Sequence, residues 1–140
     1  RGGREADFNN WSVAKNICVA DDMATARRYA RDPGSPYVLY YDQLLTKLRA
    51  GGRINLFKED QNMDDDKVTL DYVLDRLVIY GDPSSVADQV LAFQEVTGRF
   101  GKLVYAGHDW TDYELGRRSM ILMAEAVLPK INDALSEAAE

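Results

Sequence analysis

One cysteine and one histidine, Cys18 and His108, occur in the 140 residues of this chain. A lone cysteine excludes a disulfide within the chain, which suits a reducing compartment. The sequence also lacks any apolar run long enough for a membrane span or a signal peptide. Its 17 Lys and Arg against 23 Asp and Glu give a net charge of −6, which is unfavourable for contact with nucleic-acid phosphates. We therefore expect a cytoplasmic protein without a nucleic-acid or membrane partner.

The signatures of several classes of site are missing as well. There is no second histidine for a zinc site, no glycine-rich nucleotide fingerprint and no nucleophile-elbow serine. The acidic stretch 60–71 imitates the spacing of a calcium loop, but Asp65 stands where that loop needs glycine and Asp71 where it needs glutamate. We expect a solvated loop here and no metal site.

Hydrophobic and charged residues, at 46% and 29%, are present in the proportions of a folded globular protein. Alternating side chains predict a strand over residues 11–20. A helix is predicted over 83–97, because Pro83 suits the first helical position, and a strand follows over 102–106. The last helix should cover 112–128, where Pro129 kinks or ends it. This alternation predicts a parallel α/β fold.

About sixty residues, 21–80, lie between the first strand and the helix at 83–97, far more than a loop in an α/β unit needs. We predict a helical insertion, because apolar side chains fall at steps of three and four at Tyr37, Tyr40, Tyr41, Leu44, Leu45 and Leu48. An insertion of this size is usually a lid or an assembly surface. Tyr37, Tyr40 and Tyr41 are candidates to line such a lid. The alternative is packing in a core or interface, because aromatic residues at helical spacing are usually buried.

The strand at 102–106 runs directly into Gly107, His108, Asp109 and Trp110. In parallel α/β folds the C-terminal ends of the strands face the ligand, so these loop residues are the candidates for a pocket. His108 and Asp109 could form an acid–base pair, with hydrogen bonds that only shape the loop as the alternative. Trp110 either offers a flat surface to a ring-shaped ligand or plugs the mouth of the fold. No catalytic residue is assigned.

Four segments stand in a characteristic order and spacing: residues 81–90 (GDPSSVADQV), 98–101 (GRFG), 107–110 (GHDW) and 118–129 (RSMILMAEAVLP). Together they resemble the C-terminal part of the bacterial luciferase-like, flavin-dependent monooxygenases. Residues 11–21 (WSVAKNICVAD) are similar to the strand that this family places seventh in its barrel. The resemblance covers nearly the whole chain, and it rests on the ordered set of segments, since none of them is specific alone.

The resemblance implies the last two strand–helix units of a (β/α)8 TIM-type barrel, with a long helical insertion. Such a barrel needs roughly 250 residues. We therefore expect this chain, which begins without methionine, to be the C-terminal fragment of a single barrel domain. Its partner would be the missing N-terminal part or a copy of itself. A naturally short domain is the alternative. In a barrel, large side chains of the 11–20 strand such as Ile17 would face covering helices, and small ones such as Cys18 the interior.

The resemblance also implies a chemistry. The family uses reduced FMN and O2 to oxidise a small organic substrate, and a separate flavin reductase often supplies the flavin. The flavin-phosphate contacts of the family lie mostly in strands that this chain lacks, so none is assigned here. The fragment alone is expected to be inactive, and FMN binding by this chain alone is left open. Two alternatives remain: a deazaflavin-dependent oxidoreductase of the same fold, or a non-catalytic oligomerisation module built on the tyrosine- and leucine-rich helix.

Overall fold

The computed structural model describes residues 7–108 and 111–137. Its elements in chain order are η1 (Phe8–Asn10), β1 (Ser12–Val19), α1 (Met23–Arg31), α2 (Pro36–Ala50), η2 (Ile54–Phe57), η3 (Asp65–Lys67), α3 (Leu70–Leu77), β2 (Val78–Gly81), α4 (Pro83–Thr97), β3 (Lys102–Ala106), α5 (Tyr113–Leu122), η4 (Met123–Val127) and α6 (Leu128–Glu137). No helix in these two ranges is long and apolar enough to cross a membrane.

The sheet has three parallel strands in the order β2-β1-β3. β1 is central, and its two neighbours cover different halves of it: β3 pairs with Ser12 to Asn16, and β2 with Asn16 to Val19. The parallel pairing of the strands predicted at 11–20 and 102–106 agrees with the predicted parallel α/β fold. Beyond Asn16, the flank of β1 on the side of β3 has no neighbouring strand among the described residues.

Strand β2 was not predicted, and it corrects the interpretation of 21–80 as entirely helical. Its four residues are too few to show an alternating pattern, and they continue the apolar run at the end of α3. As a consequence, α4 connects β2, and not β1, to β3. In a barrel wound in sequence, β2 would lie between β1 and β3. Here it lies on the opposite flank of β1.

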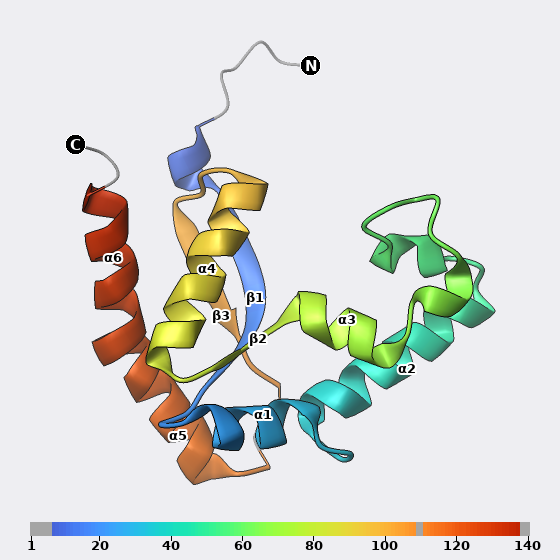
Figure 1. The fold of residues 1–140 in the computed structure, drawn as a ribbon, viewed down its shortest axis with the longest axis horizontal. Coiled ribbons are helices and arrows are strands. Elements are labelled where there is room, and N and C mark those ends of the chain that lie inside the picture. Colours follow the sequence, from blue (N-terminus) through green and yellow to red (C-terminus); the bar gives the residue numbers. More distant parts are fainter. Residues whose placement is uncertain (1–6, 109–110, 138–140) are drawn as a thin grey trace.

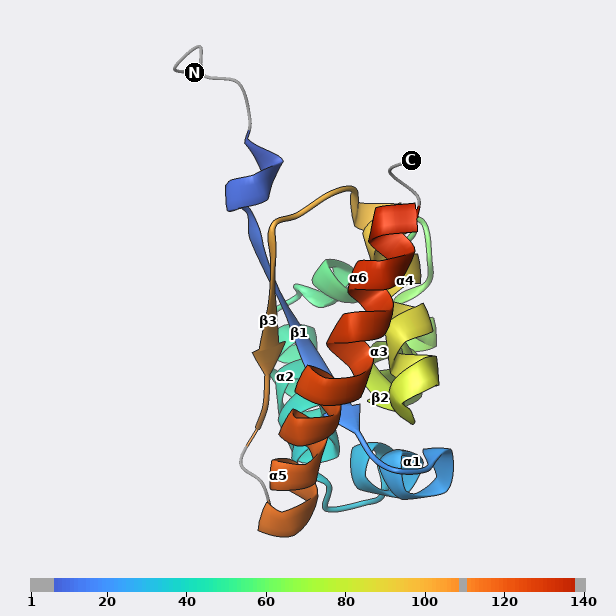
Figure 2. The same cartoon turned by 90° about the vertical axis from the view of Figure 1, so that its left-hand side faces the viewer.

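Helices cover both faces of the sheet, as Figures 1 and 2 show. On one face, Ile17 and Val19 of β1 and Ile79 of β2 pack with the apolar sides of α4, α5, η4 and α6. On the other face, Cys18 and Val78 pack with α2 and α3. The centre of the sheet is thus buried on both sides, and Ile17, Cys18 and Val19 are each 0% exposed.

The face of β1 that was expected to line a barrel interior is occupied by α2 in this structure. Asn16 and Cys18 contact or pack with tyrosines of α2, whereas Ser12 and Ala14, nearer the start of the strand, are exposed. The opposite face agrees with expectation at Ile17 and Val19, which lie under the covering helices. Trp11, just before β1, remains 52% exposed.

The predicted bounds of the helix at 83–97 and the strand at 102–106 are confirmed. The last helix differs, because it continues past Pro129 as far as Glu137. Proline lacks an amide hydrogen and its ring crowds the carbonyl four residues earlier, which normally breaks a helix. Here the wider π-helical turn η4 immediately precedes α6, and the amide of Leu128 donates to the carbonyl of Met123. A π-turn of this kind accommodates the irregularity without ending the helix.

Candidate functional site

On the side of β3, the C-terminal end of β1 has backbone groups that no strand of residues 7–108 and 111–137 satisfies. Because buried peptide groups need hydrogen-bond partners, side chains must supply them. The hydroxyl of Tyr37, from α2, donates to the carbonyl of Ile17 at 2.9 Å. The amide of Val19 donates to the Oγ atom of Ser119, from α5, at 2.8 Å. Two helices are thus joined to the strand end by hydroxyl groups.

Ser119 connects three elements at this end of the sheet. It is 0% exposed, and its Oγ atom also lies 2.7 Å from the hydroxyl of Tyr105 in β3. The adjacent Arg118 forms a two-pronged pair with Asp21, which follows β1, with Nε to Oδ2 at 3.0 Å. This hydrogen bond and the guanidinium charge hold the pKa of Asp21 below its usual range. Arg118 therefore tethers the last helix to the segment that follows β1.

His108 follows β3 and lies among the three tyrosines of α2 that the sequence singled out. Its ring centroid is 4.3 Å from that of Tyr40, at an interplanar angle of 33°. Tyr37 and Tyr41 meet it edge-on, with centroid distances of 5.3 Å and 6.4 Å. The loop after β3 and the inserted helix α2 are therefore in direct contact, and His108 with Tyr40, Tyr37 and Tyr41 forms what we call the aromatic cluster.

The three tyrosines differ in their exposure. Tyr37 and Tyr41 are 1% and 6% exposed and belong to the core, which matches the packing alternative, whereas Tyr40 is 46% exposed. The hydroxyl of Tyr41 also accepts a hydrogen bond from the side-chain Nδ2 of Asn16. Tyr40 is thus the member of the α2 trio whose ring is accessible to a ligand. Asp109 and Trp110 lie outside the described residues, and their proposed roles stay predictions.

Burial keeps the phenols and the thiol of this region protonated. Desolvation raises the pKa of Tyr37 and of Tyr41 above the usual range, and raises that of Tyr105 to about 12. It likewise raises the pKa of Cys18 to about 12. These groups are neutral hydrogen-bonding and packing groups at physiological pH, and they are not bases or nucleophiles.

Several residues that hold this end together escaped the sequence reasoning. Tyr29 of α1 accepts a hydrogen bond from the amide of Thr111 at 3.1 Å, which attaches the loop before α5 to the insertion. Ser119 of α5, which accepts from the amide of Val19, is another. A serine at a core-facing position of an apolar stripe is the signal that could have identified it, because a buried hydroxyl needs a partner.

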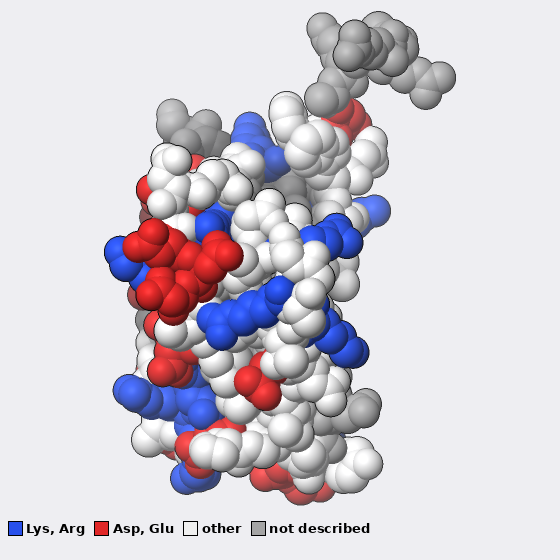
Figure 3. Space-filling model, turned by 90° about the vertical axis from the view of Figure 1, so that its right-hand side faces the viewer, with Lys and Arg blue, Asp and Glu red and all other residues white. Residues whose placement is uncertain are grey.

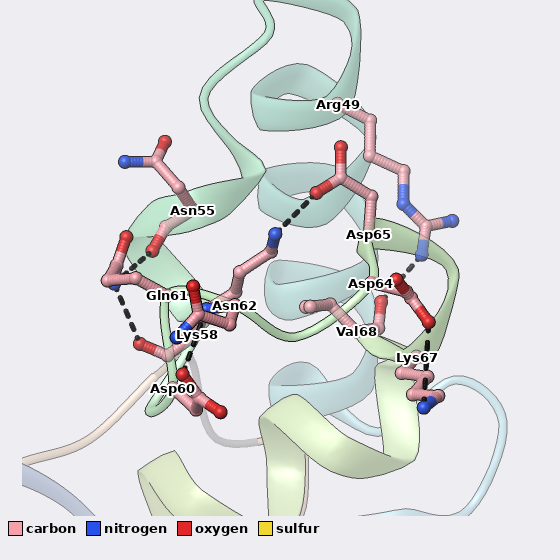
Figure 4. Close-up of polar contacts among 10 residues, drawn as sticks. All are labelled: Arg49, Asn55, Lys58, Asp60, Gln61, Asn62, Asp64, Asp65, Lys67 and Val68. Carbon is pink, nitrogen blue, oxygen red and sulfur yellow. Dashed lines mark hydrogen bonds and ion pairs between the residues drawn. The ribbon is translucent and has the colours of Figure 1, made fainter.

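The calcium-like stretch forms a different kind of structure (Figure 4). Asp60 accepts a hydrogen bond from the amide of Asn62 at 2.8 Å, while Asp64 and Asp65 pair with Lys67 and Lys58 at 3.6 Å and 2.7 Å. The carboxylates are thus engaged separately. On the face of the molecule that lies to the right in Figure 1, acidic and basic side chains gather in distinct groups (Figure 3). Among the described residues, no group of three or more His, Cys, Asp or Glu is placed to hold a metal ion.

The fold and the site define a class of protein: a parallel α/β fold with aromatic and polar side chains gathered where β1 and β3 end. That end is where such folds bind their ligands. No family model matches the chain. It is 32% identical over 133 residues to 4-hydroxyprotoasukamycin monooxygenase of Streptomyces nodosus subsp. asukaensis, covering 95% of this chain and 33% of that protein. It is 25% identical over 131 residues to 3,6-diketocamphane 1,6-monooxygenase of Pseudomonas putida, covering 92% of this chain and 34% of that protein.

A solved structure agrees with these relatives. The oxygenating constituent of 3,6-diketocamphane monooxygenase from Pseudomonas putida, a type II Baeyer-Villiger monooxygenase in complex with FMN, matches with a TM-score of 0.75 at 25% identity. The match covers 92% of this chain and 35% of that one. These findings confirm the resemblance to the luciferase-like, flavin-dependent monooxygenase family. The chain spans about a third of the length of the curated relatives it matches.

Proposed function

We propose that the chain is part of an FMN-dependent monooxygenase that uses reduced flavin and O2 to oxidise a small organic substrate. The observation that carries this proposal is the fold match, over 92% of the chain, to an oxygenase that was solved with FMN. That protein is the oxygenating constituent of its system, which supports a separate flavin reductase as a partner.

The proposal includes a barrel completed by the rest of the parent protein. Relatives about three times as long as the chain support this. The exposed side chain of Val104 on β3, at 48%, also supports it, because an edge strand with open apolar surface tends to be covered by further structure. Completion of the barrel requires a further strand beside β3. It also requires the flank of β1 that β2 now occupies to be compatible with the strand order of a barrel. The isolated chain would then be inactive.

The residues at the strand ends fit one part of FMN. The isoalloxazine ring is flat and aromatic, and Tyr40 and His108 present rings of matching character, with Tyr40 partly exposed. They do not form a phosphate cradle, because the guanidinium of Arg118 at this end is already bound to Asp21. The phosphate would be held by residues outside this chain. Reduced FMN, when bound, would supply the electrons that activate O2.

The chain's own residues would position the ring and exclude water from it. Tyr37 holds α2 against β1 through the carbonyl of Ile17, which fixes the helix that presents Tyr40. Tyr29 anchors the loop that follows His108 through the amide of Thr111. Both anchors are neutral hydrogen bonds, so they hold the rings in place without taking part in proton transfer.

The test is a titration of the full-length parent protein with FMN, in which binding is measured by flavin fluorescence. Tyr40→Ala should weaken FMN affinity by about three- to tenfold, the worth of one aromatic contact. Tyr113→Ala is the matched control, because this tyrosine of α5 is 81% exposed and should leave the affinity unchanged.

Three outcomes contradict the proposal. Equal effects of both variants would remove Tyr40 from the flavin site. Binding of a deazaflavin in place of FMN would assign the related oxidoreductase class. A folded oligomer that binds neither, as seen by size-exclusion chromatography with light scattering, would favour the oligomerisation module.

A further inference from the structure

A hollow lies where β2 begins, and no residue of the aromatic cluster lines it. The first residue of β2 pairs with Asn16, so Lys15 of β1 has no partner in β2. The Lys15 side chain faces α3 and α4. The cavity has a volume of about 370 Å³ and is lined from β1, η2, α3 and α4, including Lys15, Phe57, Lys58, Val73, Arg76 and Phe93. We call it the Lys15 groove. Its size is within the range of small-molecule sites.

The cationic groups of the Lys15 groove are not equally compensated. Arg76 pairs with Glu59, and Lys58 pairs with Asp65 at 2.7 Å. The ammonium of Lys15 instead donates to the carbonyl of Arg76 at 2.9 Å and lies 4.4 Å from the ring centroid of Phe93. Within the described ranges, no carboxylate is in ion-pair distance of it. Lys15 is half-buried, and this desolvation lowers its pKa, as expected of a cation without an anionic partner.

Apart from Glu59, which pairs with Arg76, the rest of the lining is apolar. Phe57, Phe93, Val73 and Leu77 line the same cavity as Lys15, and the Lys15 ammonium lies over the Phe93 ring. A cation set among rings and aliphatic groups suits a ligand with one charged end and an apolar body. At about 30 Å³ for each water-sized group, the volume accommodates roughly a dozen such groups.

We propose that the Lys15 groove binds a small organic monoanion, whose charged head pairs with the Lys15 ammonium and whose apolar body lies against Phe93, Phe57 and Leu77. An anion there would compensate the charge that the carbonyl of Arg76 and the Phe93 ring compensate only in part. None of the groove residues belongs to the aromatic cluster. The proposal is therefore independent of the FMN-dependent function.

The test compares octanoate with octan-1-ol, which share the alkyl body and differ in charge, by isothermal titration calorimetry on the folded 140-residue chain. Octanoate should bind at least tenfold more tightly than octan-1-ol. Lys15→Met should weaken octanoate binding about tenfold, the worth of one charge-assisted hydrogen bond, and leave octan-1-ol unaffected. Lys15→Arg should retain octanoate binding. Lys47→Met, on the exposed side of α2, should change neither ligand.

A second measurement keeps the test decisive if Lys15→Met does not fold. In an NMR titration of the unmodified chain, octanoate should shift the amide signals of Lys15, Arg76 and Phe93. Failure of octanoate to bind, equal affinity for both ligands, full affinity in a folded Lys15→Met variant, or shifts confined to other residues would each overturn the proposal.

Discussion

Removing the hydroxyl of Ser119 tests whether this side chain holds the strand end together. In Ser119→Ala the buried amide of Val19 loses its acceptor, which costs about 1 to 3 kcal/mol, and the bond with Tyr105 adds about 1 kcal/mol. The better helix propensity of alanine offsets about 0.5 kcal/mol. The cavity left behind is small, since only one atom is removed. We expect the free energy of unfolding to fall by about 1.5 to 3.5 kcal/mol.

The measurement is urea unfolding followed by circular dichroism, with hydrogen exchange of the Val19 amide as a local readout. Ser136→Ala is the control, because its hydroxyl bonds only within the exposed end of α6, and a change below about 0.5 kcal/mol is expected. A double-mutant cycle with Tyr105→Phe should show coupling, since the two hydroxyls are 2.7 Å apart. A loss below 0.5 kcal/mol in Ser119→Ala, with unchanged protection of Val19, would refute the reasoning.

Two further predictions concern a buried thiol and a helix cap. Cys18, with a pKa raised to about 12 from 9.0, should resist iodoacetamide at pH 8 in the folded chain and react in urea. The pKa of Cys18 is higher in the folded than in the unfolded chain, so the protonated thiol contributes to stability fully below about pH 9. This contribution is lost as the pH rises towards 12, and urea-unfolding midpoints measured across that range should fall accordingly. Asp82→Ala removes the acceptor of the Ser85 amide at the start of α4 and should cost about 1 kcal/mol in urea unfolding, whereas Asp88→Ala, exposed within the same helix, should cost little.

The elements with strong local signals could be predicted from sequence. Pro83 and the cap at Asp82 define the start of α4, and the apolar run 102–106 is long enough to read as a strand. β2 could not be predicted, because four apolar residues directly after a helix have the pattern of either element. The continuation of the last helix past Pro129 also escaped, since local rules for proline do not include a π-turn that absorbs the irregularity.

The candidate site was predictable in part for a similar reason. A single histidine after a strand, and tyrosines at helical spacing, are visible in the sequence as separate features. Their contact depends on where α2 packs, which is a tertiary property. The role of Ser119 depends on β3 ending before β1 does, so that an amide is left to be satisfied. Local sequence patterns predict neither the strand register nor the backbone groups of β1 that are left without a partner in β3.

The parallel sheet also has a consequence for synthesis of the chain. The hydrogen bond between Val19 and Ser119 joins residues separated by 100 positions. At about 5 to 20 residues per second, β1 leaves the ribosome about 5 to 20 seconds before its partner on α5 exists. During that interval β2 and helices α1 to α4 are made, but the face of Ile17 and Val19 still lacks α5, η4 and α6, and the amide of Val19 lacks its acceptor. A nascent chain in this state is a substrate for chaperones that bind short apolar segments, and ribosome profiling with such a chaperone should find it engaged until α5 has emerged.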